Sequence, residues 1–184
     1  STLGKIDIQG PDAAEFITRM YTNSYLKLAP GKCRYGVMLK EDGMIFDDGV
    51  CACLGDNHYL MFTTTGGAAG VLAWLEIWQQ TEWPELQVYF TSVTDHWATA
   101  TVTGPNARRV IAKVCQDIDL SNEAFAFMDW RDGTVAGVKA RVFRISFTGE
   151  LSYEVNVPAH YGRHIWQALI EAGEEFSMTP YGTE

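Results

Sequence analysis

The chain has 184 residues, of which 47% are hydrophobic and 20% charged, a composition typical of a globular protein with a sizeable core. Its formal net charge of −9 argues against nucleic acids and anionic membranes as main partners, because both bind basic surfaces. No apolar run reaches the roughly 18 residues of a membrane span, and we expect a cytoplasmic protein.

The first half of the chain reads as strand, helix, three strands and helix. Gly10-Pro11-Asp12 begins the first helix, since proline suits the first turn and an acidic residue favours the positive end of the helix dipole. Asp42-Gly43 is a hairpin signal. We predict strands over residues 5–9, 33–40, 44–54 and 58–64, and helices over residues 13–20 and 67–80.

The second half repeats this plan after Trp83-Pro84, which ends the second helix and joins the halves. Asp132-Gly133 is the corresponding hairpin signal. We predict strands over residues 88–93, 97–102, 125–130, 138–146 and 151–157, and helices over residues 106–114 and 161–172. Antiparallel strands joined by hairpins, with two helices in each half, predict an α+β fold.

The two halves are related by an ungapped repeat at an offset of 94 residues. The matched positions are mostly glycine, proline and apolar residues, the types that set backbone shape and core packing. Matched pairs include Gly10 and Gly104, Pro11 and Pro105, Ile17 and Ile111, Gly43 and Gly137, Tyr59 and Tyr153, and Leu75 and Leu169. The repeat predicts one body built from two similar halves, residues 1–80 and 95–174, that share a core.

Positions where one half has a carboxylate and the other an apolar residue mark candidate sites, because the scaffold does not need the charge. Asp48 stands opposite Val142, and Glu154 stands opposite Leu60. Asp47 and Asp48 are neighbours on a predicted strand, so only one of them can face a given cavity. Either both are solvated charges at a bulge or strand end, or one faces a pocket as a general base or the partner of a cation.

Glu154 shares one face of its predicted strand with Ser152 and Asn156. If that face is open to water, Glu154 is an ordinary surface residue. If it lines a cleft, the carboxylate is a bidentate acceptor for paired N–H donors. Glu150, in the preceding turn, reads as a solvated residue.

Two further patterns favour ordinary structural roles. The glycine-rich segment 66–70 at a helix start lacks the spacing of a phosphate-binding loop, and close packing of a helix on a strand explains it. His160 and His164 have a zinc-binding spacing without a third ligand in view, so we expect surface histidines and no metal site.

Two motifs are characteristic: Phe46-Asp47-Asp48 after a hairpin that contains glycine, and residues 147–150 (Phe-Thr-Gly-Glu) followed by Glu154. They resemble the glycine-cleavage T-protein family, the tetrahydrofolate-dependent aminomethyltransferases. Within this family, segments 4–11, 33–43, 130–133 and 179–184 are most similar to the C-terminal region of the alpha subunits of heterotetrameric sarcosine oxidases. The resemblance covers nearly the whole chain.

The resemblance implies a folate-binding domain made of two swapped, ferredoxin-like subdomains. It also implies that this chain lacks both ends of that domain. It implies an enzyme that oxidises sarcosine to glycine and hydrogen peroxide, while the methyl carbon passes to tetrahydrofolate as 5,10-methylene-tetrahydrofolate. FAD, FMN and NAD would bind outside this segment, and the partners would be the beta, gamma and delta subunits. The isolated segment would then be inactive as an oxidase.

The resemblance also implies roles for five residues. Asp48 matches the family's catalytic aspartate, which accepts the proton that an attacking amine loses. Glu154 matches the glutamate that binds the pterin ring, and Tyr35 matches a tyrosine that lines the folate pocket. Phe147 replaces a tyrosine of T-proteins, and Thr64 replaces a pocket asparagine that many of them carry.

Two other functions stay open at this point. One is an aminomethyltransferase of the glycine-cleavage T-protein type, against which Phe147 and the ending Tyr-Gly-Thr-Glu at residues 181–184 count. The other is a non-catalytic scaffold that binds a folate or a partner subunit. Asp48 counts against the scaffold, which would not need this carboxylate.

Overall fold

The computed structural model describes residues 3–182. They divide into an N-terminal unit, residues 3–95, and a C-terminal unit, residues 96–182. Thr183 and Glu184, which belong to the matched ending of the chain, lie outside the described residues. No helix between residues 3 and 182 is long and apolar enough to span a membrane.

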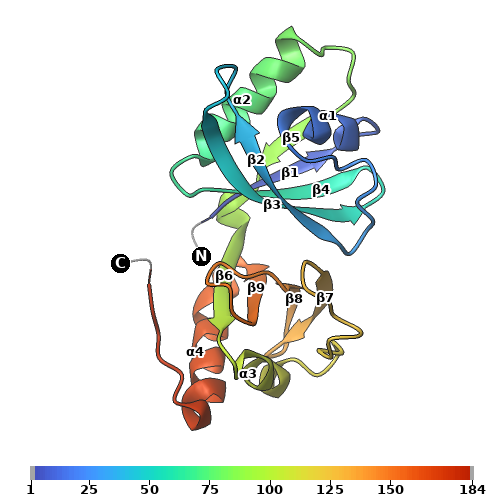
Figure 1. Cartoon of the computed structure of the whole chain (residues 1–184). Helices are drawn as coiled ribbons and strands as arrows, with labels where there is room; N and C mark the ends of the chain where they lie inside the picture. The colour runs from blue at the N-terminus through green and yellow to red at the C-terminus, as the bar shows by residue number, and fades with distance from the viewer. Residues whose placement is uncertain (1–2, 183–184) are drawn as a thin grey trace. The chain divides into compact units, whose positions relative to one another are not determined.

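The N-terminal unit is an antiparallel sheet with two helices on one face (Figure 1). Its elements are β1 (Gly4–Gln9), α1 (Ala13–Met20), β2 (Cys33–Leu39), β3 (Ile45–Gly55), β4 (His58–Thr63), α2 (Ala68–Thr81) and β5 (Tyr89–Ser92). The strand order is β2-β3-β4-β1-β5. Ile6, Ile17 and Leu75 are fully buried between the sheet and the helices. Burial of side chains of this size contributes roughly 1.5–3 kcal/mol each.

The C-terminal unit has the same layers (Figure 1). Its elements are β6 (Trp97–Thr103), α3 (Ala107–Val114), β7 (Trp130–Val135), β8 (Val138–Phe143), β9 (Ser152–Pro158) and α4 (Gly162–Gly173). The strand order is β6-β9-β8-β7. Ile111, Val155 and Leu169 lie in the core of this unit. The α+β fold predicted from the sequence is therefore confirmed. Every strand of residues 3–182, including β5, pairs within its own unit.

The sequence repeat corresponds to equivalent elements in the two units. α3 begins and ends 94 residues after α1, and β9 begins 94 residues after β4. β3 and β8 depart from this offset. Ala52 of β3 pairs with Leu60, whereas Phe143 of β8 pairs with Glu154, so β8 follows β3 at an offset of 91 residues.

The ungapped alignment is therefore wrong at one of the positions that marked a candidate site. The counterpart of Asp48 is Lys139 and not Val142, and the counterpart of Asp47 is Val138. The reason is that β3 has 11 residues and β8 only 6, while the connection that follows β8 is correspondingly longer. The contrast itself survives, because the second copy of the scaffold has no carboxylate at the position of Asp48.

The hairpin before β8 also differs from the prediction. The strand predicted over residues 125–130 is wrong, because β7 covers Trp130–Val135 and Asp132-Gly133 lies inside it. The turn is Ala136-Gly137, whose φ angles of 48° and 79° suit a tight two-residue hairpin. Gly133 serves packing instead, since a Cβ at this position would lie 2.6 Å from the Cδ1 atom of Ile118.

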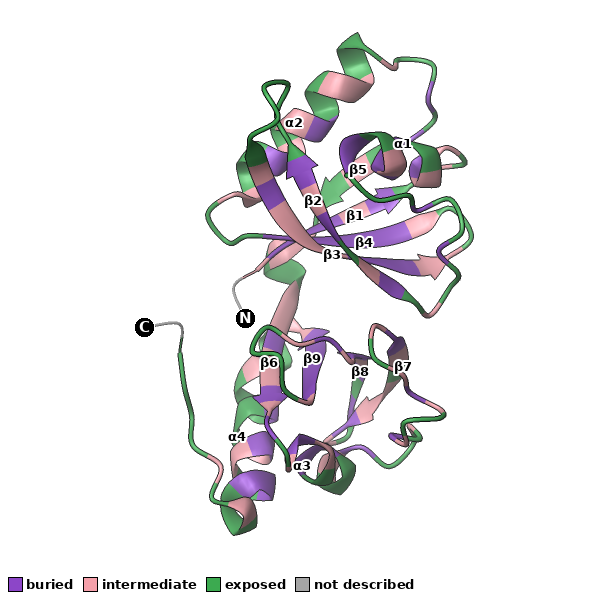
Figure 2. Ribbon diagram, viewed as in Figure 1, coloured by how far each residue is buried: buried purple, intermediate pink, exposed green. Residues whose placement is uncertain are grey.

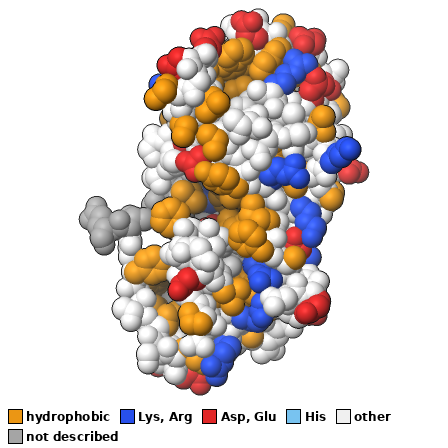
Figure 3. Space-filling model, viewed as in Figure 1, with side chains coloured by type: hydrophobic (Ala, Val, Ile, Leu, Met, Phe, Trp, Pro, Cys, Tyr) orange, Lys and Arg blue, Asp and Glu red, His pale blue; other side chains and the backbone are white. Residues whose placement is uncertain are grey.

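Some large apolar side chains remain on the surface. Met44 and Ile45, next to the turn of the β2–β3 hairpin, are exposed. On the face drawn in Figure 3, hydrophobic side chains lie among basic and acidic ones. Single exposed apolar residues are common on soluble proteins, and these carry no functional argument by themselves.

Candidate functional site

Asp47 and Asp48 point to opposite faces of the N-terminal sheet, as alternation along a strand predicts. Asp47 pairs with the fully buried Met38 and is itself 4% exposed on the face that the helices cover. Asp48 pairs with Val37 on the other face and is partly exposed. The two adjacent carboxylates therefore have different environments, and Asp48 is the more accessible one.

Tyr35 lies beside Asp48 on the same face. Its hydroxyl group donates a hydrogen bond of 2.9 Å to Oδ2 of Asp48, and this bond raises the pKa of Tyr35. The phenol is half exposed, so the pair is accessible from solvent on the N-terminal unit. A carboxylate held in this way can accept a proton from a molecule bound next to it.

Thr64 contacts the other carboxylate. Its hydroxyl group donates a 2.6 Å hydrogen bond to Oδ1 of Asp47, and its backbone N–H lies 3.3 Å from Oδ2. Burial raises the pKa of Asp47, although the hydrogen bonds from Thr64 act in the opposite direction. Thr64, predicted as a pocket residue, thus fastens the start of the β4–α2 connection to β3.

Close packing accounts for Gly67 at this connection, in the glycine-rich segment before α2. A Cβ there would lie 2.5 Å from Oγ1 of Thr64 and 3.1 Å from Oδ1 of Asp47. The packing interpretation made from the sequence fits this position.

Glu154 lies inside β9, the strand between β6 and β8. Ser152, Glu154 and Asn156 share one face of this strand, while Tyr153 and Val155 point into the core. All of these side chains are buried, and Figure 2 shows β9 as buried along nearly its whole length. The alternative in which the Glu154 face is open to water is therefore excluded.

Asn156 was not among the residues that the sequence singled out. Its Oδ1 atom accepts a hydrogen bond from the hydroxyl group of Thr99. Its Nδ2 atom, like Oγ of Ser152, is buried and has no hydrogen-bond partner within residues 3–182. An unsatisfied buried polar group costs roughly 1–3 kcal/mol, which makes this face a candidate for binding a polar molecule. The alternation of polar residues around Glu154 was the signal that could have found Asn156.

The remaining candidates are Phe147, His160 and His164. Phe147 is 90% exposed in the connection between β8 and β9. The ring of His160 lies against that of Tyr161, tilted by 43°, in a short 3₁₀ turn before α4. Nε2 of His164 lies 2.9 Å from the carbonyl oxygen of Ala136. Within residues 3–182 no group of three or more His, Cys, Asp or Glu side chains could hold a metal ion.

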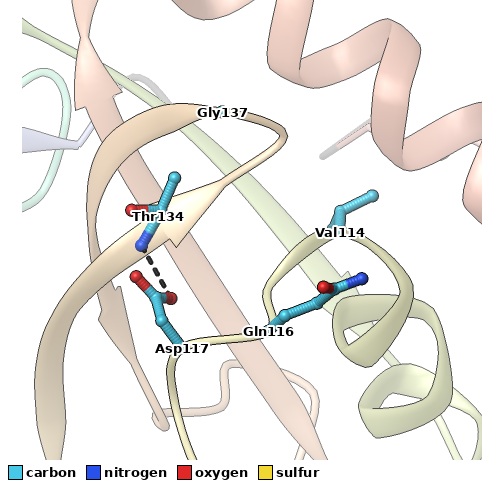
Figure 4. Close-up of a pocket in the computed structure, with 5 residues that line it drawn as sticks. All are labelled: Val114, Gln116, Asp117, Thr134 and Gly137. Atoms are coloured by element: carbon cyan, nitrogen blue, oxygen red, sulfur yellow. Dashed lines mark hydrogen bonds between the residues drawn. The ribbon is translucent and has the colours of Figure 1, made fainter.

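A shallow pocket of about 400 Å³ opens on the C-terminal unit (Figure 4). Its lining comprises Val114, Gln116, Asp117, Thr134 and Gly137. The Asp117 carboxylate accepts a 2.9 Å hydrogen bond from the backbone N–H of Thr134, which lowers the pKa of Asp117. This hydrogen bond joins the loop before β7 to the strand, so we assign the Asp117 carboxylate a structural role.

Comparison with known proteins decides the family. The protein-family model described as the GCVT N-terminal domain matches residues 1–184. The chain belongs to this family. Its relatives include the sarcosine oxidase alpha subunits of Corynebacterium sp. (strain P-1) and Rhizobium meliloti, at 57% and 49% identity over the whole chain. An aminomethyltransferase of Bacillus subtilis is 32% identical over 99% of the chain. These findings confirm the resemblance seen in the sequence.

The chain spans 19% of the length of those alpha subunits and 48% of the aminomethyltransferase. Solved structures that share the fold include the following two. An aminomethyltransferase T of the glycine cleavage system from Bartonella henselae has a TM-score of 0.77 at 23% identity, covering 92% of this chain and 44% of that one. A chain of heterotetrameric sarcosine oxidase from Corynebacterium sp. U-96, in complex with pyrrole 2-carboxylate, has a TM-score of 0.72 at 18% identity, covering 99% and 85%.

Proposed function

We propose that this chain is the one-carbon transfer segment of a sarcosine oxidase. The complete enzyme oxidises sarcosine to glycine and hydrogen peroxide, and the methyl carbon passes to tetrahydrofolate to give 5,10-methylene-tetrahydrofolate. The single observation that carries the proposal is the buried Glu154 in the middle of a polar face of β9. Family membership and alpha-subunit relatives at 49–59% identity support it.

The residues of each cluster, taken within its own unit, fit part of a folate. The Glu154 carboxylate can accept two hydrogen bonds from the adjacent N–H groups of a pterin ring. The unsatisfied Ser152 hydroxyl and Asn156 amide supply further polar contacts on the same face. Tetrahydrofolate supplies the amine nitrogens that take up the one-carbon unit. Asp48 accepts the proton that such a nitrogen releases, and Tyr35 holds the carboxylate of Asp48 in place.

The proposal also covers the other parts of the complete enzyme. FAD, FMN and NAD bind outside this segment, and the beta, gamma and delta subunits are its partners in the cytoplasm. Phe147 is exposed and free to contact either a folate or a neighbouring subunit. Thr64 contributes indirectly, through the loop that it ties to Asp47.

Substitution of Asp48 in the complete native enzyme tests the proposal. Asp48→Asn removes the proton acceptor and should lower formation of 5,10-methylene-tetrahydrofolate by about 100-fold or more. Oxygen uptake with sarcosine should continue, and free formaldehyde should rise. Lys139→Gln, at the equivalent position of the other unit, is the matched control and should leave the product ratio unchanged. An unchanged product ratio in Asp48→Asn would favour a non-catalytic scaffold.

A further inference from the structure

We infer that Asn156 recognises the 4-oxo group of the pterin ring and selects against ligands with an amino group at that position. The inference rests on the proposed function, because it concerns the ligand that Glu154 binds. It assigns a specificity-determining role to a residue that neither the sequence motifs nor the fold had marked.

Asn156 is placed to share a ligand with Glu154. The two residues are two apart on β9 and lie on the same face, which separates their Cα atoms by about 6.5–7 Å. Their side chains are 1% and 6% exposed. This spacing would let one edge of a flat heterocycle lying along the strand contact both side chains.

The Thr99 hydroxyl contacts the Oδ1 end of the Asn156 amide. Thr99 faces Asn156 across the β6–β9 pair and donates to its Oδ1 atom. The Nδ2 atom is then the end of the amide that remains for a ligand, and it has no partner within residues 3–182. A buried amide donor calls for an acceptor, which the ligand must supply.

The scaffold does not require a polar residue at this position. The counterpart of Asn156 in the N-terminal unit is Phe62 on β4, just as Leu60 is the counterpart of Glu154. Phe62 and Leu60 are both buried. The equivalent strand thus folds with two apolar residues in the N-terminal unit. In the C-terminal unit it folds with the hydrogen-bond acceptor Glu154 and the donor Asn156.

The acceptor Glu154 and the donor Asn156 together match one edge of a 4-oxo pterin. That edge presents the 2-amino group and N3–H as donors to Glu154, followed by the 4-oxo oxygen as an acceptor for Nδ2 of Asn156. A 4-amino pteridine has an unprotonated N3 and a donor at position 4, so it opposes both side chains. Mismatched polar groups in a buried site discriminate more strongly than missing apolar contacts.

Folic acid and aminopterin, which carry the 4-oxo and the 4-amino group on otherwise matching skeletons, are the probes for a test. Calorimetric titration of the complete native protein should show that the wild type prefers folic acid. Asn156→Asp keeps the acceptor for Thr99 but replaces the donor by a carboxylate oxygen. We expect it to lower the ratio of folic acid to aminopterin affinity by about tenfold or more.

Three further variants make the outcome decisive. Asn156→Ser removes the amide without adding a charge and should reduce the preference for folic acid, also if Asn156→Asp fails to fold. Asn57→Asp adds the same charge in an exposed turn of the other unit and should leave the ratio unchanged. Glu154→Gln should weaken binding of folic acid itself.

The possible results separate the inference from the proposed function. If Glu154→Gln weakens folate binding while Asn156→Asp and Asn156→Ser keep the wild-type ratio, the inference is wrong and the proposed function stands. If the wild type binds neither folic acid nor a reduced folate, both are wrong. A preference that falls in both Asn156 variants supports the inference.

Discussion

The two units of this chain share the order of four equivalent strands but differ on one face of one of these strands. β4 of the N-terminal unit buries Leu60 and Phe62 where β9 of the C-terminal unit buries Glu154 and Asn156. The difference separates what the scaffold needs from what a ligand needs, because the fold forms with either set. The polar residues of β9 are therefore functional candidates with an internal control inside the same molecule.

The largest effect on stability is expected when residues are exchanged between β4 and β9. Leu60→Glu places an uncompensated carboxylate at a buried apolar position and should lower the free energy of unfolding by about 3 kcal/mol or more. Glu154→Leu gives β9 the residue of its counterpart and should have a much smaller effect, or stabilise the protein. Denaturant unfolding followed by circular dichroism measures both. Similar losses in the two variants would contradict the comparison.

A smaller effect is expected from the glycine beside Asp48. A Cβ on Gly49 would lie 2.0 Å from the carbonyl oxygen of Phe62, whereas its counterpart Ala140 carries a Cβ in the other unit. Gly49→Ala should lower the free energy of unfolding by about 1–3 kcal/mol, because the backbone must move. Ala140→Gly should cost only about 0.5–1 kcal/mol. A Gly49→Ala protein with the melting temperature of the wild type would show that β3 adapts as β8 does.

The smallest effect concerns the pH dependence contributed by Asp47, whose counterpart is the apolar Val138. Burial raises the pKa of Asp47 in the folded protein above its usual value near 3.8. At a pH below 3.8 the neutral Asp47 carboxyl group therefore contributes to the free energy of unfolding. This contribution is lost as the pH rises through the raised pKa. Asp47→Asn cannot ionise, so its stability relative to the wild type should increase from pH 3 to pH 7. Urea midpoints measured across this range test the sign, and a constant difference would contradict the burial effect.

The sequence predicted the elements where hydrophobic periodicity and helix-start signals agree. The first helix over residues 13–20 has the predicted bounds, and the repeat places α3 94 residues later. The strand over 125–130 was wrong because Asp132-Gly133 is a typical turn dipeptide, while the matching of Gly43 with Gly137 already pointed to the real turn. The repeat indicates this turn more accurately than the local dipeptide does.

The candidate site was only partly predictable. Alternation predicted that Asp47 and Asp48 would face opposite ways, and the strand pairing agrees. Which face is buried depends on contacts that are distant in sequence, so the sequence alone could not decide whether Glu154 is covered. The hydrogen bond between Thr99 and Asn156 joins residues 57 apart, and no local pattern indicates it.

Glu154 is proposed to bind the pterin and Asp48 to serve the transfer step. Calorimetric titration of the complete native protein with folinic acid, using the wild type, Glu154→Gln and Asp48→Asn side by side, tests it most directly. Glu154→Gln should weaken binding more than tenfold, which corresponds to about 1.4 kcal/mol, and Asp48→Asn should bind within about threefold of the wild type. Undiminished binding by Glu154→Gln, or equal losses in both variants, would contradict this division of roles.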